Sequence, residues 1–184
     1  MAKTVASIKF SYEDYKSLPE SETKRHELLG GELEMTPSPT WKHQSIAAAL
    51  FKHLIQFVEA HNLGSVRFAP LDVVLSGKDV IQPDLLFISN GNSHIVQGDE
   101  IRGAPDLTVE IFSPSTIDRD RRYKRTLYAR CGVREYWLVD PEMQTIEVLS
   151  LSKQGYQRVD HYQAGQTLHS PLLTGLQIAL DQVF

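Results

Sequence analysis

Two stretches of the sequence decide the fold: IQPDLLFI at residues 81–88 and APDLTVEIF at residues 104–112. Each is a short apolar run typical of a buried strand, and each has carboxylates inside the run or at its start. An acid buried in an apolar strand is costly unless it is paired or binds a metal. Two such acids on successive strands therefore predict a metal site rather than an accident of packing.

The order of expected helices and strands on both sides of these stretches predicts a mixed α/β protein with a central sheet and helices on its faces. An N-terminal helix and a Gly-Gly hairpin come first, and a β-rich tail comes last. The expected elements are a helix at 10–18, a hairpin at 26–35, a helix at 41–61, strands at 65–75, 81–88 and 105–112, a helix at 116–131, a strand at 135–140, a hairpin at 145–162 and a tail at 167–184.

Length and charge limit the possible partners. With 184 residues, we expect residues 1–184 to form one domain. The net charge of -4 gives no overall attraction to nucleic acid, but residues 119–134 hold seven basic side chains and one acid, Asp120. A basic patch beside an acidic site suits a polyanionic substrate. A solvated helix face explains the same charges, and charge alone does not decide between the two.

The single cysteine, Cys131, rules out an internal disulfide and suits a reducing, cytoplasmic setting. Residues 1–10 contain no apolar stretch typical of a signal peptide, and no run approaches the roughly 20 apolar residues of a membrane span. We therefore expect a cytoplasmic protein without a membrane anchor.

The spacing of the acids indicates which of them share an ion. Asp106 and Glu110 point to the same side of one strand, but four residues of strand separate them by ~13 Å, which is too far for one metal. Neighbouring strands lie only about 4.8 Å apart, so Glu110 needs a partner on an adjacent strand, and Asp84 is the natural candidate. We expect Asp106 to cap the mouth of its strand or to bond the neighbouring loop. Oxygen ligands indicate Mg²⁺ or Mn²⁺, and the histidines form no zinc motif.

A lysine would complete the residue set of a phosphodiester hydrolase. Phe112 stands two residues after Glu110, so the nearest downstream lysine is Lys124, on the following helix. Asp120, Lys124 and Tyr128 fall on one face of that helix at a spacing of four residues. That face could return over the sheet end that carries Asp84 and Glu110.

With these motifs the chain resembles the Uma-two family of restriction endonucleases, within the PD-(D/E)XK nuclease-like superfamily. The resemblance spans about residues 10–184, and the order of the matching pieces makes the set specific. The pieces are YEDY at 12–15, ELLGGEL at 27–33, SP at 38–39 with His43, QPDL at 82–85, APDLTVEI at 104–111, SPST at 113–116, Asp118, Lys124, Tyr128 and GVREYWLVDP at 132–141.

The resemblance implies a restriction-endonuclease-like αβββαβ core. It also implies a Mg²⁺- or Mn²⁺-dependent endonuclease that hydrolyses phosphodiester bonds in DNA. Asp84 would be the first motif acid and Glu110 the second, with both binding the metal. Lys124 would replace the lysine that is missing at Phe112.

The resemblance also places residues at the edge of the site. Glu27 and His43 would be further catalytic-site residues, and Gln82 precedes the first motif acid. Basic side chains near Lys124 would grip flanking phosphates, so binding should weaken as salt rises. These nucleic-acid-binding candidates are Arg119, Arg121, Arg122 and Arg125.

Two other functions are compatible with the sequence. The acidic overall charge suits a nucleic-acid-binding or protein-binding module with little or no catalysis on a nuclease-like scaffold. Alternatively, the β-rich tail beyond Asp140 could supply the surface of a homodimer in a purely structural protein. Asp84, Glu110 and Lys124 favour the nuclease.

Overall fold

The computed structural model describes residues 9–18, 25–113 and 119–184. The start of the helix expected at 116–131 lies outside these residues, as does Asp118. The elements are α1 (Tyr12–Lys16), β1 (Arg25–Leu29), β2 (Glu32–Thr36), α2 (Trp41–Ala60), β3 (Gly64–Phe68), β4 (Val73–Ser76), β5 (Asp79–Ile81), β6 (Leu85–Ser89), η1 (Asn90–Ile95), β7 (Val96–Gln97), β8 (Glu100–Arg102), β9 (Leu107–Ile111), η2 (Arg119–Lys124), α3 (Arg125–Cys131), β10 (Glu135–Asp140), β11 (Thr145–Ser152), β12 (Gly155–Gln163), β13 (Thr167–His169), β14 (Gln177–Ala179) and η3 (Leu180–Gln182).

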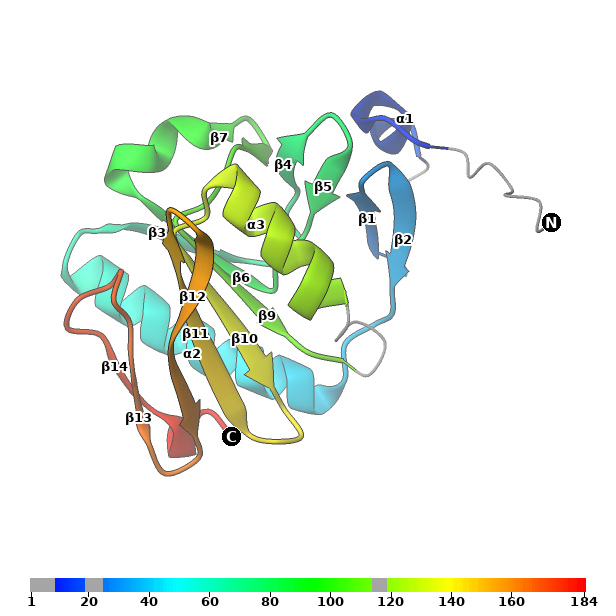
Figure 1. Ribbon diagram of the computed structural model, residues 1–184. Helices are drawn as coiled ribbons and strands as arrows, with labels where there is room; N and C mark the ends of the chain where they lie inside the picture. Colours follow the sequence, from blue (N-terminus) through cyan, green and yellow to red (C-terminus); the bar gives the residue numbers. More distant parts are fainter. Residues whose placement is uncertain (1–8, 19–24, 114–118) are drawn as a thin grey trace.

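The central sheet has the strand order β12-β11-β10-β9-β6-β3. The strand β6 pairs antiparallel with β3 on one side and with β9 on the other, whereas β9 and β10 pair in parallel. A parallel pair needs a crossover, and the segment η2–α3 supplies it. Together with α2, these elements form the αβββαβ core that the resemblance implied, and the expected fold class is confirmed (Figure 1).

A second sheet, ordered β2-β1-β5-β4-β8-β7, corrects the strand predictions. The strands expected at 65–75 and 81–88 are each broken, and each runs from one sheet to the other. Pro70 and Pro83 lie at the two breaks, because a proline has no N–H to continue the ladder. The interval 89–103, expected to be turns, contains η1, β7 and β8, whose short strands show no clear apolar alternation.

The N-terminal hairpin pairs Glu27 with Glu34 and Leu28 with Leu33. Its turn requires the positive φ angles of Gly30 (58°) and Gly31 (82°), which glycine adopts without steric cost. β1 also pairs with β5, so the hairpin belongs to the second sheet. This pairing brings Glu27 toward the end of β5, where the chain crosses between the sheets.

Helices pack on both faces of the central sheet. On one face, an apolar stripe of α2 at helical spacing is buried against strand residues and the C-terminal tail. On the other face, Leu127 and Tyr128 of α3 pack between the central sheet and residues of the second sheet. Each fully buried aliphatic side chain contributes roughly 1.5–3 kcal/mol, so these two layers fix the crossing segment between them. Among the described residues, no helix combines the length and apolar character needed to cross a membrane.

Candidate active site

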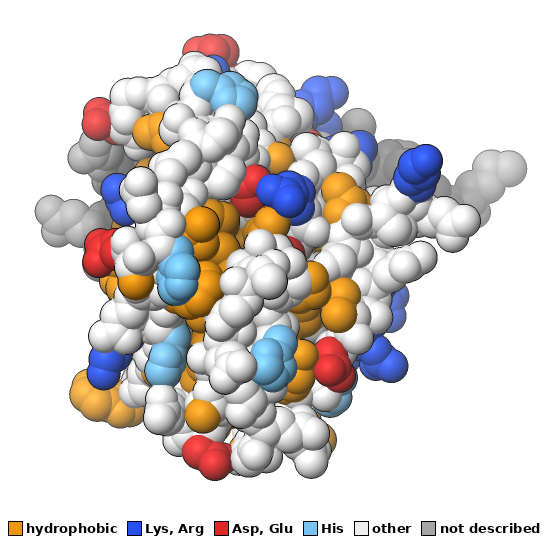
Figure 2. Space-filling view, turned by 90° about the vertical axis from the view of Figure 1, so that its left-hand side faces the viewer, with side chains coloured by type: hydrophobic (Ala, Val, Ile, Leu, Met, Phe, Trp, Pro, Cys, Tyr) orange, Lys and Arg blue, Asp and Glu red, His pale blue; other side chains and the backbone are white. Residues whose placement is uncertain are grey.

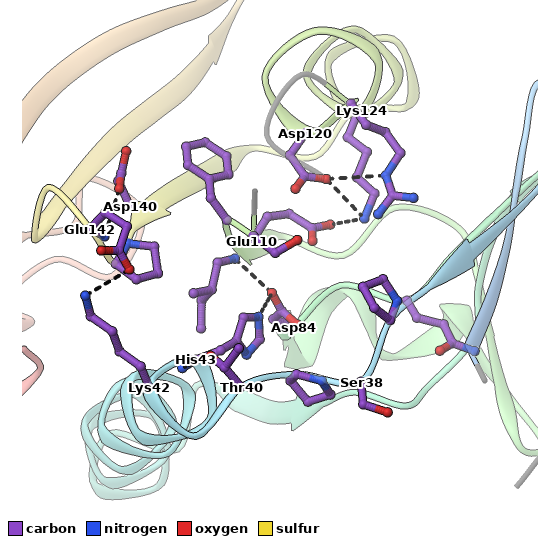
Figure 3. A pocket seen from close by; sticks show the side chains of 18 of the residues that line it. Ser38, Thr40, Lys42, His43, Asp84, Glu110, Asp120, Lys124, Asp140 and Glu142 are labelled. Carbon is purple, nitrogen blue, oxygen red and sulfur yellow. Dashed lines mark hydrogen bonds and ion pairs between the residues drawn. The ribbon is translucent and has the colours of Figure 1, made fainter. Parts of the chain in front are cut away.

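Asp84 and Glu110 meet at the point where the chain leaves the second sheet for the central one. Asp84 immediately precedes β6, and the register Leu85 to Val109 places it opposite Glu110 on β9. The Oδ2 atom of Asp84 accepts a hydrogen bond of 2.8 Å from the Ile111 amide at the end of β9. Both carboxylates line one pocket (Figure 3). The two acids are therefore cross-strand neighbours, as the strand spacing predicted.

Lys124 reaches these acids from the other side of the pocket. Its Nζ lies 2.9 Å from Glu110 Oε1, 2.9 Å from Glu27 Oε1 and 3.6 Å from Asp120 Oδ1. The side chain is only 2% exposed. A π-helical turn, η2, leads into α3 at this lysine, and such wider turns often occur at functional sites. The structure thus brings together Asp84, Glu110 and Lys124, while their catalytic roles remain a prediction.

Tyr128 lies one turn beyond Lys124 and also contacts Glu110. Its hydroxyl donates a hydrogen bond of 2.5 Å to Glu110 Oε1, and the side chain is fully buried. Burial raises the pKa of the Tyr128 hydroxyl, and the Glu110 carboxylate raises it further, so the phenol stays a donor. The four-residue spacing of Asp120, Lys124 and Tyr128 predicted this face of the helix. The sequence did not indicate that Tyr128 contacts Glu110.

The buried part of the site carries more negative than positive charge. Glu27, Glu110 and Asp120 are buried together with one cation, Lys124. Burial raises the pKa of Glu110 well above its ordinary value. Lys124 opposes this effect, whereas the carboxylates of Asp120, Asp84 and Glu27 reinforce it. Burial alone would lower the pKa of Lys124, but the carboxylates of Glu110, Glu27 and Asp120 outweigh it and raise the pKa. A further cation would relieve this excess of negative charge.

Glu27 and His43 also line this pocket, and Glu27 is buried beside Lys124 rather than at the edge of the site. Glu27 Oε1 accepts a 2.9 Å hydrogen bond from the backbone N–H of Gln82, and Glu27 Oε2 lies 3.6 Å from Arg119 Nη2. His43 lies in the first turn of α2, with Nε2 3.2 Å from Asp84 Oδ2. Thr40 caps this turn by accepting a hydrogen bond from the His43 amide, which fixes the imidazole beside the first motif acid.

Gln82 connects the site to Asp72, which the sequence did not indicate. Its Nε2 donates to Asp72 Oδ1 at 2.8 Å, and the same oxygen accepts a hydrogen bond from the Tyr15 hydroxyl. Asp72 lies in the other crossing segment, between β3 and β4, so the two crossings are joined beside the pocket. No sequence signal pointed to Asp72, because its partners are distant along the chain.

The four arginines proposed to bind nucleic acid do not converge. Arg119 lines the pocket and lies close to Glu27 and Asp120. Arg121 lies over the Phe112 ring and 3.9 Å from Asp140 Oδ2, at the pocket wall. Arg122 is exposed, and Arg125 donates to the Tyr156 carbonyl of β12.

The other basic side chains of this window point elsewhere. Arg130 pairs with Asp79 and Arg134 pairs with Asp106. Asp106 also accepts hydrogen bonds from the Ser89 amide and the Asn92 side chain, so it bonds the neighbouring segment at the end of β6, which is one of the two roles predicted for it. On the face shown in Figure 2, Lys and Arg side chains stand largely apart from one another. The basic window is therefore spread over several parts of the molecule.

The pocket has a volume of about 580 Å³. An ion pair of 3.1 Å between Lys42 of α2 and Glu142 of the β10–β11 turn lies on the side away from Lys124 (Figure 3). Within the described residues, no group of three or more His, Cys, Asp or Glu side chains is arranged to hold a metal ion. Two convergent carboxylates still suit Mg²⁺, which binds through one or two carboxylates and completes its shell with water and substrate phosphate.

Comparisons with known proteins identify the family and the fold of this chain. A family model, Uma2, described as "putative restriction endonuclease", matches residues 12–181. A solved structure, described as a "putative nuclease belonging to DUF820" from Anabaena variabilis ATCC 29413, superposes with a TM-score of 0.78. It is 22% identical and covers 95% of this chain and 97% of its own, which establishes a shared fold. A search among curated proteins gave no match.

Proposed function

The chain belongs to the Uma2 restriction endonuclease family, and we propose that it is a metal-dependent endonuclease that hydrolyses phosphodiester bonds in DNA. The observation that carries this proposal is the convergence of Asp84, Glu110 and Lys124 on one pocket. These residues follow one another along the chain as two acids and a lysine, which is the residue set that metal-assisted phosphodiester hydrolysis needs, and they meet at one end of the sheet.

Asp84 and Glu110 are the residues that would hold Mg²⁺ or Mn²⁺. The bound ion would lower the pKa of a water molecule and polarise a phosphate oxygen. The Ile111 amide and His43 keep the Asp84 carboxylate in place. Glu110 is oriented in the same way by Lys124 and Tyr128. These fixed partners position both ligands before substrate arrives, which lowers the cost of reaching the reactive arrangement.

Lys124 supplies the positive charge of the site. Its raised pKa keeps the amine protonated, so it acts as an electrostatic group rather than a base. In the proposed reaction it stabilises negative charge that develops on the phosphate. Glu27 and Asp120 hold the amine on its inner side, and Arg119 is placed to contact a neighbouring phosphate.

The test is DNA cleavage with Mg²⁺ or Mn²⁺ by the wild-type protein and by Asp84→Ala. Single-stranded, duplex and branched DNA serve as substrates, and Asp160→Ala, which removes an exposed acid on β12, is the matched control. We expect Asp84→Ala to abolish cleavage and the control to retain it, with thermal unfolding confirming that both fold. Cleavage that survives Asp84→Ala would reject the assigned site.

A second candidate is a DNA-binding module without catalysis. The exposed guanidinium of Arg121 beside the pocket favours it, because such a group can contact phosphate without any metal. Salt-dependent DNA binding that requires Arg121 and Arg122, with no cleavage under any metal, would support this candidate. Binding that is indifferent to both arginines would exclude it.

A further inference from the structure

A second, smaller pocket of about 270 Å³ lies directly behind His43. Its walls come from α2, the end of β3 and the start of β6. His43 and Asp84 line both this pocket and the larger one. A ligand that reaches from one pocket into the other therefore passes the first motif acid.

The small pocket suits a flat, uncharged group. Ala47 and Ala48 line it with side chains too short to fill it. Phe68 stands at its side with 57% of its surface exposed, and its ring meets Phe51 edge-on at 4.9 Å. Gln44 adds an amide that can both donate and accept hydrogen bonds. None of the described residues that line it is a lysine or arginine, so the pocket is poorly suited to a phosphate.

We propose that this pocket binds an unpaired nucleobase of the strand whose phosphate lies at Asp84 and Glu110. The inference rests on the proposed function, because the two pockets share His43 and Asp84 as lining residues and a base in the small pocket would therefore lie beside the acidic site. Bases of an intact duplex are stacked inside the helix, so a base reaches such a pocket only from a single strand or a locally unpaired site. Exposed aromatic rings bind such bases by stacking, with little dependence on sequence.

The distribution of cations supports the same substrate class. Duplex binding depends on many Lys and Arg contacts with the phosphate backbone. Three described cations line the larger pocket, Lys42, Arg119 and Lys124, and each of them already lies close to at least one acid. Stacking on Phe68 would therefore contribute more to substrate binding here than phosphate contacts do. The substrate class is single-stranded DNA, or DNA with an unpaired base beside the cleaved bond.

The experiment measures binding without catalysis, in EDTA, by fluorescence anisotropy of a short labelled single strand. Phe68→Ala removes the stacking surface, Phe68→Trp keeps it, and Val96→Ala removes an equally exposed apolar side chain on β7. We expect Phe68→Ala to weaken single-strand binding by about 5- to 150-fold. Phe68→Trp and Val96→Ala should bind like wild type, and a fully paired duplex should bind more weakly and with no dependence on Phe68.

Equal affinity of wild type and Phe68→Ala for single strands would overturn the base pocket, as would tighter binding of the duplex. Metal-dependent cleavage, measured in parallel, separates this outcome from failure of the proposed function. Cleavage that needs Asp84, together with binding that ignores Phe68, would reject the pocket and keep the nuclease. Binding that needs Phe68, with no cleavage under any metal, would keep the pocket and reject the nuclease.

Discussion

Glu110 and Glu135 are two buried glutamates on neighbouring strands of one sheet, and their surroundings differ in kind. They lie on β9 and β10, which pair in parallel, and they are 4% and 1% exposed. Burial raises the pKa of both carboxyls. From the sequence alone each is an acid in or beside an apolar run, so only the partners of each residue distinguish them.

Glu135 is surrounded by neutral donors. Its Oε1 accepts hydrogen bonds from Trp137 Nε1 at 2.7 Å and Ser170 Oγ at 2.6 Å, and its Oε2 accepts one from the Leu172 amide at 2.8 Å. Two of these donors belong to the C-terminal segment. The carboxylate therefore joins that segment to the central sheet, which is a structural role.

Glu110 is surrounded by other charges. Lys124 and Tyr128 donate to it, but Asp84, Glu27 and Asp120 lie close enough to raise its pKa. Placing like charges together in a buried site costs stability, and proteins accept such a cost mainly where function requires it. The neighbours of a buried acid, rather than its burial, thus distinguish the proposed active site from a structural contact.

The largest expected effect comes from Glu110→Gln. Glutamine keeps an oxygen for Lys124 and Tyr128 but removes one of the crowded negative charges. We expect DNA cleavage to fall by at least about 1,000-fold, because the proposed metal ligand is lost. The melting temperature should stay the same or rise, because the repulsion is relieved. Cleavage rates and thermal unfolding of one preparation test both parts, and a variant that stays active would place Glu110 outside the site.

Glu135→Ala should show the opposite behaviour. It leaves three donors without their acceptor in a buried place, so we expect the free energy of unfolding to fall by about 3 kcal/mol. The cleavage rate per folded molecule should not change, because Glu135 does not line the pocket. Urea unfolding measures the loss, with Glu59→Ala on the exposed side of α2 as the control. A loss of cleavage without a loss of stability would contradict the structural role.

The sequence predicted much of the site because its signals are local. Strand spacing paired Asp84 with Glu110, and helical spacing brought Lys124 to the same side. The crossings at Pro70 and Pro83 were missed because a proline indicates a break in a strand but not which sheet receives the next segment. The role of Glu135 was also missed, because Ser170 and Leu172 lie more than 30 residues away.

The basic window shows why charge counts predict less than spacing does. The basic side chains of residues 119–134 lie on successive turns of η2 and α3 and in the segment after α3, so they point in different directions. Arg125 contacts β12, Arg130 contacts Asp79, and Lys124 is buried among acids. The sign of the charge could be read from the sequence, but the direction of each side chain depends on packing against distant strands.

Asp79 is a third buried acid, and its contribution to stability depends on pH in the opposite direction to that of Glu135. Burial alone would raise the pKa of Asp79, but hydrogen bonds from Ser76, Tyr123 and the Gly30 amide, together with Arg130, outweigh burial and lower it. Its stabilising contribution is therefore present above the ordinary value of 3.8 and is lost as the pH falls below it. Glu135 has a raised pKa, so its ionisation destabilises the fold as the pH rises above 4.5.

Asp79→Asn should therefore be less stable than wild type near neutral pH, and the difference should shrink as the pH falls through 3.8. Urea unfolding across a pH series measures this difference, with Glu135→Ala measured alongside. The part of the Glu135→Ala difference that depends on pH should run the other way and grow as the pH falls toward 4.5, because wild type gains stability when Glu135 is protonated. If the stability loss of the two variants changed with pH in the same direction, the surroundings of Asp79 and Glu135 would not set their pKa values in the way described.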